Sequence, residues 1–535
     1  MFVVYLNIIL ISKSQIQTMI NPKNTLVYIL ICITISMSAQ DKNIEYGEPF
    51  ETRGLFKIIG EIDNQLVVQQ IHMTIQRQSS SRGSGIGISF QPASTVEEKF
   101  YLYNKDLTMD REIITSTFSL RKSIYSEKLI DISIQEGYIS KLVLDISGKK
   151  KKKPRLRVIP SMADKLKKSE IRIQFKEKTN TSDSGDHFLG NRKHIDVIST
   201  YMSEDKSKMV MLVSNEKKTE NRIILLDRKL DYNIIEEHIL DLVGETDRHK
   251  ILSLSVSNDG KIGAIVMNYY SNGYGESKKG KPNYDLELIM INKQGNTSHK
   301  ISSQNYFWLN PAMLIDTQGQ VFLSCLLGEK KNSKVAKFYS AKFDEKLGTI
   351  YELMTTPKNH SKINSKFGKN YKMSHILPIN EDLTISVSTN LKAKNKGELI
   401  AHRYTYKGLT LDAVDGKGKY LWSKTIEKND KQSVVANCII PDVYYSEKGV
   451  EIFMNYSEKT IDQFMVEQPK EVSYPTKNNI LTRVTVDTKG NVEMEEISDI
   501  DKYSFGSNIH FDNGHYYFML TDNKFKNAQF AKAHF

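Results

Sequence analysis

The sequence predicts an all-β protein that folds as a single propeller of eight four-stranded antiparallel blades. Three observations lead to this fold. Short apolar runs alternate with polar turns, pairs of runs recur at a nearly constant spacing, and the last unit lacks a strand. The 535 residues suffice for one large repetitive domain, whose core grows by adding units. With 39% hydrophobic and 26% charged residues, the composition is that of a folded protein.

Residues 253–296 show the repeating unit most clearly. A strand at 253–257 turns at Asn258-Asp259-Gly260 and returns along 262–267, and a later strand at 286–291 ends in the turn 292–295. Such turns between apolar runs predict hairpins, because Gly, Asn and Asp tolerate the positive φ that tight turns require. Two successive hairpins therefore define the unit.

Eight first hairpins recur along the chain. They turn near Asp63, Glu136, Glu204, Asp259, Gln318, Glu381, Lys448 and Asn513. The mean spacing of about 64 residues is regular, which is typical of a repeat architecture. Second hairpins follow, each marked by an apolar residue before an Asp- or Asn-type turn. Their turns begin at Asn104, Asp227, Asn292, Asp344, Asp415 and Asp487, with a degenerate case at Asp164.

The eighth second hairpin is missing, because the chain ends where it would turn. Residues 528–535 resemble the third strand of unit five, residues 335–343. Residues 43–50 precede the first hairpin and belong to no unit, so we expect them to close the ring as the missing strand. Seven blades remain the alternative if one hairpin pair is misread. An array of sandwich domains is disfavoured, because no linker rich in Pro, Gly or Ser separates the units.

The amino terminus predicts an export signal over residues 1–39 and a propeller domain over 40–535. Met19 begins a short basic start, 26–35 is an apolar run too short to span a bilayer, and small residues precede cleavage near Ala39. The first eighteen residues fit an upstream start codon or a second hydrophobic segment. We expect a periplasmic, cell-surface or secreted protein with no transmembrane segment in the mature chain. Cys325 and Cys438 fall in units five and seven, so we expect buried free thiols.

Basic residues concentrate in the connections between the second and third strands of the units. With strands named A to D from the inside outwards, the A–B and C–D turns share one face, and the B–C and D–A connections share the other. The B–C connections are expected at 77–84, 147–155, 215–222, 270–284, 328–334, 391–398, 456–478 and 522–526. Together they carry about +15, against +12 for the whole chain.

This charge predicts a positive rim that binds an acidic partner. The candidate binding residues are Arg82, Lys149, Lys150, Lys151, Lys152, Lys153, Lys278, Lys279, Lys281, Lys330, Lys331, Lys392, Lys394 and Lys396. Acidic polysaccharide, lipopolysaccharide or an envelope protein would fit, and nucleic acid stays among the alternatives. Lysine also simply solvates loops, and a run such as 149–153 is commonly a solvated turn. Tyr269, Tyr270, Tyr274 and Tyr284 lie beside these charges and suit stacking on sugars or bases.

No local motif predicts catalysis, a cofactor or a metal. Residues 79–87 are Gly-rich but lack the strand and helix of a phosphate-binding loop. Asp183, Asp186, His187 and His194 form the densest group of potential ligands, with spacing typical of neither a calcium loop nor a zinc pair. His375 and His510 are expected on innermost strands, where an imidazole is more often satisfied by its neighbours.

Residues 411–422, which read LDAVDGKGKYLW, resemble the repeat of the quinoprotein-like (PQQ-like) propellers. In that family an Asp-x-x-x-Gly turn precedes a Trp that docks between neighbouring blades, and eight is the usual blade number. The turn recurs near Asp487 and Asn292 without a Trp, and Trp308 lies outside the equivalent position. The family includes quinone-dependent dehydrogenases and non-enzymatic envelope scaffolds. The dehydrogenases' adjacent-cysteine pair is absent, so their activity is not implied.

The sequence therefore predicts an exported, non-enzymatic propeller that acts as a binding or scaffold protein. The alternative is a glycan-acting enzyme whose site is assembled from several blades. Two or more carboxylates, or a metal cluster, in the central channel would favour the enzyme. A structural partner in an envelope complex that uses the other, near-neutral face is a third possibility.

Overall fold

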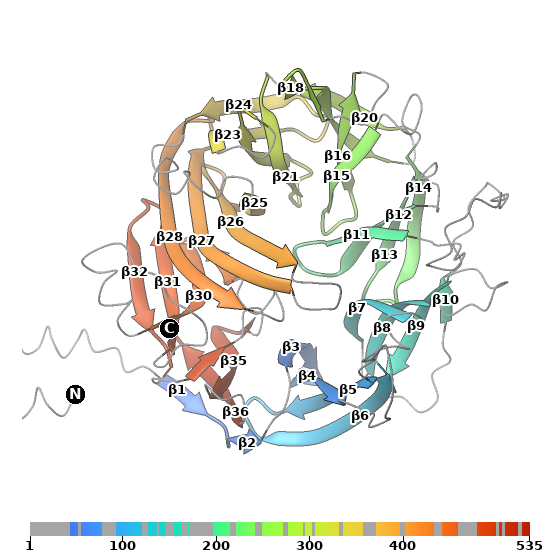
Figure 1. Cartoon of the computed structure of the whole chain (residues 1–535), viewed down its shortest axis with the longest axis vertical. Helices are drawn as coiled ribbons and strands as arrows, with labels where there is room; N and C mark the ends of the chain where they lie inside the picture. The colour runs from blue at the N-terminus through green and yellow to red at the C-terminus, as the bar shows by residue number, and fades with distance from the viewer. Residues whose placement is uncertain are drawn as a thin grey trace, which may run out of the picture.

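A computed structural model of the chain forms a closed ring of β-sheets (Figure 1). The structure describes residues 43–51, 55–76, 93–119, 127–135, 138–145, 155–161, 169–171, 196–214, 221–240, 249–270, 276–292, 295–301, 305–330, 335–356, 371–395, 402–432, 441–457, 479–498, 502–504, 509–522 and 527–535. These residues contain strands and no helix. Accordingly, no helix in them has the length and apolarity needed to cross a membrane.

Eight antiparallel sheets form the blades. Blade 1 contains β3 (Leu55–Ile62), β4 (Gln65–Gln76), β5 (Ala93–Tyr103) and β6 (Met109–Ser119); blade 2 contains β7 (Glu127–Gln135), β8 (Tyr138–Asp145), β9 (Arg155–Ser161) and β10 (Ser169–Ile171). Blade 3 contains β11 (Asp196–Met202), β12 (Lys208–Ser214), β13 (Asn221–Asp227) and β14 (Asn233–Ile239); blade 4 contains β15 (His249–Val256), β16 (Ile262–Tyr269), β19 (Tyr284–Ile291) and β20 (Thr297–Ile301).

The second half of the ring continues the pattern. Blade 5 contains β21 (Phe307–Ile315), β22 (Val321–Gly328), β23 (Val335–Phe343) and β24 (Thr349–Thr355); blade 6 contains β25 (Tyr371–Asn380), β26 (Leu383–Asn395), β27 (His402–Asp415) and β28 (Tyr420–Gln432). Blade 7 contains β29 (Asp442–Ser446), β30 (Gly449–Ser457), β31 (Asn479–Asp487) and β32 (Val492–Glu496). Blade 8 contains β33 (Lys502–Ser504), β34 (His510–Asp512), β35 (His515–Asp522) and β36 (Asn527–His534), completed by β1 (Asn43–Tyr46) and β2 (Phe50–Glu51).

The predicted eightfold repeat is confirmed, and seven blades are ruled out. The template stretch is blade 4, whose fourth strand begins at Thr297, just beyond it. Asp63 and Asn64 form a two-residue turn with φ values of 48° and 65°. Residues 136–137 lie outside the described ranges, but the pairing of Gln135 with Tyr138 flanks them. The degenerate turn at Asp164 also lies outside these ranges.

A repeated five-residue turn sets the hairpin geometry. In turns that begin at Asp316, Asp344, Asp415 and Asp487, the Asp Oδ1 accepts N–H hydrogen bonds from the residues two and four positions later, at 2.7–3.0 Å. The fourth residue adopts a left-handed φ, which is 82° at Gly490. Asp suits the first position because its carboxylate satisfies two turn N–H groups that the strands leave unpaired.

The ring closes between the two ends of the chain, as predicted. Strand β1 pairs with β36, from Asn43 opposite His534 to Tyr46 opposite Ala531. The Gly47 N–H then donates to the Phe530 carbonyl at 2.9 Å. Strand β1 is thus the outermost strand of blade 8, and the chain passes directly from it into blade 1. Tyr103 of blade 1 stacks on Phe530 with ring centroids 4.8 Å apart, which adds packing to the seam.

Trp422 on β28 docks against the C–D turn of blade 7, as the resemblance implied. Its indole N–H donates to the Thr488 carbonyl at 3.0 Å. A Cβ added to Gly490 would lie only 2.8 Å from the Trp422 ring. Tyr351 takes the same position in blade 5, where its Cβ would meet a Cβ on Gly418 at 2.8 Å. Tyr351 was not predicted from the sequence because the family pattern has Trp at this position, although both residues lie seven positions after the turn Asp.

Apolar side chains fill the space between neighbouring blades. The largest cluster joins blades 4 and 5 and includes Leu288, Leu323 and Cys325, all completely buried. Cys325 is a free thiol, as expected, and burial raises its pKa well above the ordinary value. Cys438 lies outside the described residues.

The contact between Trp422 and Gly490 predicts a large cost for Gly490→Ala. A non-Gly residue at a left-handed φ costs roughly 1–2 kcal/mol, and here the new methyl group also displaces the indole. Gly280→Ala is the matched control, because Gly280 has a φ of 79° with no atom near its Cβ position. Urea denaturation should show a greater loss of stability for Gly490→Ala. Equal losses of stability in the Gly490→Ala and Gly280→Ala variants would mean that the docking of Trp422 on Gly490 does not contribute to stability.

The closing strand predicts that a chain beginning at Glu51 melts below one beginning at Asn43. The shorter chain loses the pairing of β1 and of Phe50 in β2, and it exposes most of the edge of β36. Thermal unfolding followed by circular dichroism compares the two chains. An unchanged melting temperature would show that the amino-terminal strand does not hold the ring closed.

Candidate ligand-binding pocket

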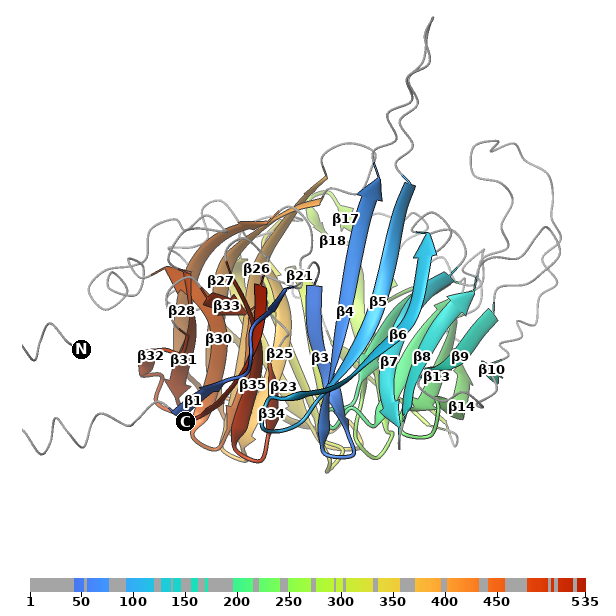
Figure 2. The ribbon, with the colours of Figure 1, turned by 90° about the horizontal axis from the view of Figure 1, so that it is seen from below.

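The two faces of the ring differ in their connections. The described A–B and C–D turns lie together on one face, here called the turn face, and the B strands end at the other, here called the connection face (Figure 2). In the described turns acidic side chains outnumber basic ones, with Asp63, Asp259, Asp316, Glu381 and Asp382 among them. The described B–C connection of blade 4 instead holds three lysines on the small ribbon of β17 (Ser277–Lys278) and β18 (Lys281–Pro282).

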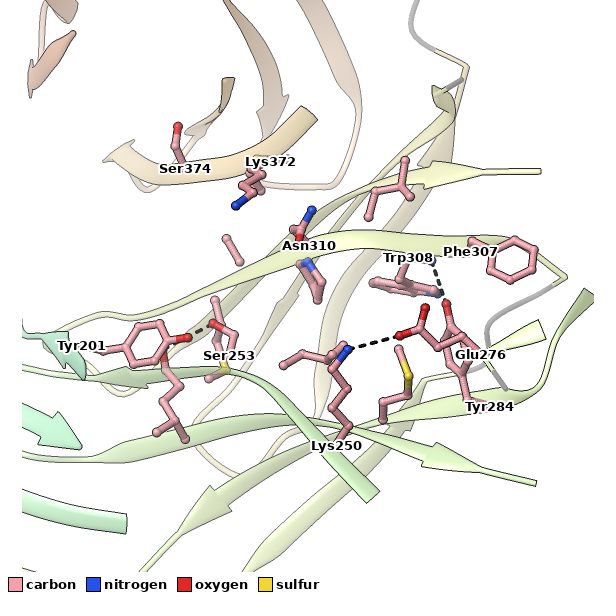
Figure 3. Close-up of a pocket in the computed structure, with 18 residues that line it drawn as sticks. Tyr201, Lys250, Ser253, Glu276, Tyr284, Phe307, Trp308, Asn310, Lys372 and Ser374 are labelled. Atoms are coloured by element: carbon pink, nitrogen blue, oxygen red, sulfur yellow. Dashed lines mark hydrogen bonds and ion pairs between the residues drawn. The ribbon is translucent and has the colours of Figure 1, made fainter. Parts of the chain in front are cut away.

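A cavity of about 450 Å³ opens beside this ribbon (Figure 3). Its wall includes the first residues of three successive innermost strands, β15, β21 and β25, so it lies toward the connection face. Lys250, Trp308 and Lys372 are the second residues of those strands. Glu276, at the start of the B–C connection ribbon of blade 4, completes one side.

A bulge in β21 shapes the wall of the cavity. Asn310 and Pro311 lie between Leu309 and Ala312, opposite a single residue of β22, and Asn310 has a φ of 54°. The innermost strands β3, β7, β11, β15 and β25 also show register shifts. A bulge turns side chains away from the regular alternation, and here it presents Asn310 to the cavity from β21, facing Lys372 on β25 (Figure 3).

The polar groups of the cavity differ in whether they have partners. The Lys250 ammonium lies 3.2 Å from the Glu276 carboxylate, with the lysine side chain 53% exposed. The Tyr284 hydroxyl accepts a hydrogen bond from the Trp308 backbone N–H at 3.0 Å, and burial raises the pKa of Tyr284 well above its usual value. Tyr284 therefore stays neutral. The indole N–H of Trp308 is buried and has no hydrogen-bond partner among the described residues.

The candidate lysines predicted from the sequence fall into three groups. Lys278, Lys279 and Lys281 are exposed on the ribbon that follows Glu276, and Lys330 is exposed after β22. Lys392 and Lys394 were expected in a loop at 391–398, but β26 continues to Asn395, so they belong to a strand. That strand curves toward the centre of the ring in Figure 1. The remaining candidates, Arg82, Lys149, Lys150, Lys151, Lys152, Lys153, Lys331 and Lys396, lie outside the described residues.

Sequence reasoning missed the cavity residues Lys250, Trp308 and Lys372. They come from three blades and precede no recognisable motif. Their common signal is position, since each lies nine or ten residues before the A–B turn of its blade, at Asp259, Gln318 and Glu381. Only a correct count of blades would have shown that these positions share one wall.

The turn-face end of the channel carries a contact across the ring. The Tyr445 hydroxyl on β29 of blade 7 donates to the Glu204 carboxylate in the A–B turn of blade 3, 241 residues away. Blades 3 and 7 lie on opposite sides of the ring (Figure 1). Burial, with the nearby positive charges of Lys57 and Arg228, lowers the pKa of Lys206 in the same turn.

The described residues contain no group of three or more side chains suited to hold a metal ion. The sequence candidates Asp183, Asp186, His187 and His194, and the Gly-rich residues 79–87, lie outside the described ranges. His375 and His510 are on innermost strands, as expected. Burial lowers the pKa of both imidazoles.

The fold defines the protein as an eight-bladed β-propeller with a cavity at the mouth of its channel. No protein-family model and no curated protein sequence matches the chain. Similar solved structures include the Vanderwaltozyma polyspora Nup133 β-propeller domain, at 10% identity and a TM-score of 0.33, covering 76% of this chain and 94% of that one.

Two further structures show the same level of likeness. They are Kuenenia stuttgartiensis hydrazine synthase, at 12% identity and a TM-score of 0.30, covering 64% of this chain and 81% of that one, and an oligogalacturonate lyase in complex with manganese, at 9% identity and a TM-score of 0.34, covering 87% and 97%. At these values we draw no conclusion about function from them.

The lowered pKa of His375 predicts acid destabilisation well above the range of the carboxylates. Because the unfolded chain binds a proton more readily than folded His375, stability should fall as the pH drops below about 6.5. Asp259, Asp487 and Asp512 have lowered pKa values, so their contributions disappear only below about pH 4.

His375→Gln should therefore flatten the fall in melting temperature between about pH 7 and pH 5. His510→Gln serves as the comparison, since the pKa of His510 is lowered in the same direction. If His375→Gln and the parent protein lost equal stability over this interval, His375 would not be the titrating group.

Proposed function

We propose that the protein is an exported, non-enzymatic binding protein that holds an acidic glycan on its connection face. The observation that carries this proposal is the convergence of positive charge at the cavity. Lys250 and Lys372 come from separate innermost strands, and the ribbon with Lys278, Lys279 and Lys281 follows directly from the cavity residue Glu276. Export rests on the signal predicted in residues 1–39, which lie outside the described ranges.

The distribution of charge supports binding on this face. Acidic side chains outnumber basic ones in the described turns opposite, so a polyanion would be attracted more strongly to the connection face. Tyr270 is 58% exposed at the start of the same blade 4 connection, and an aromatic ring beside ammonium groups suits a sugar that carries carboxylates. Polyanion binding through exposed lysines should weaken as salt rises.

The described cavity gives little support to the alternative of a glycan-acting enzyme. Glycoside hydrolysis ordinarily uses two carboxyl groups on either side of the scissile bond. The lining contains one carboxylate, Glu276, and it is paired with Lys250. Binding without chemistry therefore accounts best for this set of residues.

The proposal predicts salt-sensitive retention of the protein on immobilised alginate, a polyuronate, and weak retention on neutral dextran. Replacing Lys278, Lys279 and Lys281 together by Gln should weaken alginate binding roughly tenfold at low ionic strength, since an exposed charge pair contributes about 0.2–1 kcal/mol. Lipopolysaccharide and duplex DNA columns run under the same conditions compare the other acidic partners.

The matched control replaces three turn-face lysines, Lys346, Lys417 and Lys489, by Gln. It changes the net charge equally, and all three side chains are exposed. Equal losses in the two triple variants would show general charge attraction rather than a binding face. Stronger retention on DNA than on alginate or lipopolysaccharide would show that the ligand is nucleic acid and not an acidic glycan.

A further inference from the structure

The indole N–H of Trp308 is a hydrogen-bond donor that the described protein does not use. Trp308 is 94% buried, given its 6% exposure, and it lines the cavity. Its backbone N–H donates to the Tyr284 hydroxyl, and the centroids of the Trp308 and Tyr339 rings lie 4.6 Å apart. A buried donor left unpaired is unfavourable. The indole nitrogen is covered by protein atoms in this structure, so an acceptor atom on a ligand can reach it only when the ring shifts as the ligand binds.

The charged groups around the cavity specify more of the ligand. The Glu276 carboxylate pairs with Lys250, whereas the exposed Lys372 has no ion-pair partner among the described residues. A ligand carboxylate would therefore be attracted to Lys372. A carboxylate oxygen can accept more than one hydrogen bond, so Glu276 can bind a ligand hydroxyl group alongside the partners it already has.

Apolar side chains complete the lining. Met267, Phe307 and Met313 contribute to the wall together with Pro311. A pyranose ring presents C–H groups to such a surface and hydroxyl groups at its edge. The volume of about 450 Å³ lies within the range of 300–1,000 Å³ that is usual for small-molecule sites.

We propose that this cavity binds a uronic acid residue of an acidic glycan. The Trp308 indole N–H donates to a ring or hydroxyl oxygen, the Lys372 ammonium pairs with the carboxylate, and Glu276 accepts from a hydroxyl group. This inference rests on the proposed function and adds the identity of the sugar. The ribbon lysines would hold the rest of the chain, and the cavity would select the residue it contains.

The chain offers a direct readout, because it contains only two Trp residues, Trp308 and Trp422. Protein labelled with ¹⁵N-tryptophan should give two indole N–H signals, which Trp308→Phe assigns. Glucuronate should shift the Trp308 signal and leave that of Trp422, at the junction of blades 6 and 7, unchanged. Glucose, which lacks the carboxylate, and acetate, which lacks the ring, are the control ligands. Each should shift the Trp308 signal at least tenfold less than glucuronate does at equal concentration.

Calorimetry with glucuronate measures the individual contributions. Lys372→Gln and Trp308→Phe should each weaken binding about tenfold, because each removes one polar contact with the ligand. Lys417→Gln on the turn face is the matched control and should bind as the parent does. Lys372 is exposed, so its replacement tests the proposal even if Trp308→Phe unfolds.

The outcomes separate this inference from the function on which it rests. Retention on alginate without any glucuronate-dependent shift of Trp308 would overturn the uronate site and leave the binding face intact. Loss of both the alginate retention and the Trp308 shift would overturn the uronate site and the proposed binding face together. Equal shifts with glucuronate and acetate would reduce the cavity to a simple anion site, and this too contradicts the proposal.

Discussion

The pairing of β1 with β36 is the constraint on which the rest of the structure depends. In blades 1 to 7 the four strands follow one another along the chain, with only the β17–β18 ribbon inserted in blade 4, whereas blade 8 takes its outermost strand from the opposite end. Joining residues so distant in sequence costs only slightly more than joining near ones, because loop-closure entropy grows with the logarithm of length. The pairing covers the edge of β36 and gives blade 8 its outermost strand, so that the blade between the two ends of the chain is complete.

Turn chemistry made the architecture predictable. Asp259-Gly260 and Asp415 with Gly418 specify hairpins through backbone conformations that few other residues adopt, so eight repeats could be counted from the sequence. The cavity was not predictable in this way. Trp308 and Lys372 lie in different blades and come together only when blades 5 and 6 pack against each other, and the bulge at Asn310 and Pro311 has no local signature strong enough to be recognised. The ribbon lysines were found because they form a run within one connection.

The two faces of the ring use charge in different ways. On the turn face some carboxylates, such as those of Asp316 and Asp415, accept hydrogen bonds from backbone N–H groups, and others pair with a neighbouring lysine. The Lys105 ammonium, for example, lies 2.7 Å from both Glu61 and Asp512 and links blade 8 to blade 1. On the connection face the ribbon lysines protrude into solvent. Some acidic and basic groups of the turn face therefore hold the structure together, whereas the ribbon lysines of the connection face stay accessible to a ligand.

The five-residue turn restricts how such a protein can diverge. Its Asp accepts hydrogen bonds from the residues two and four positions later, so inserting or deleting one residue would break both bonds together. Changes in chain length are then tolerated mainly in the connections on the opposite face. Descendants of one ancestral propeller would keep the spacing of these turns as a record of common origin. Their connections would vary with the surfaces each protein came to recognise.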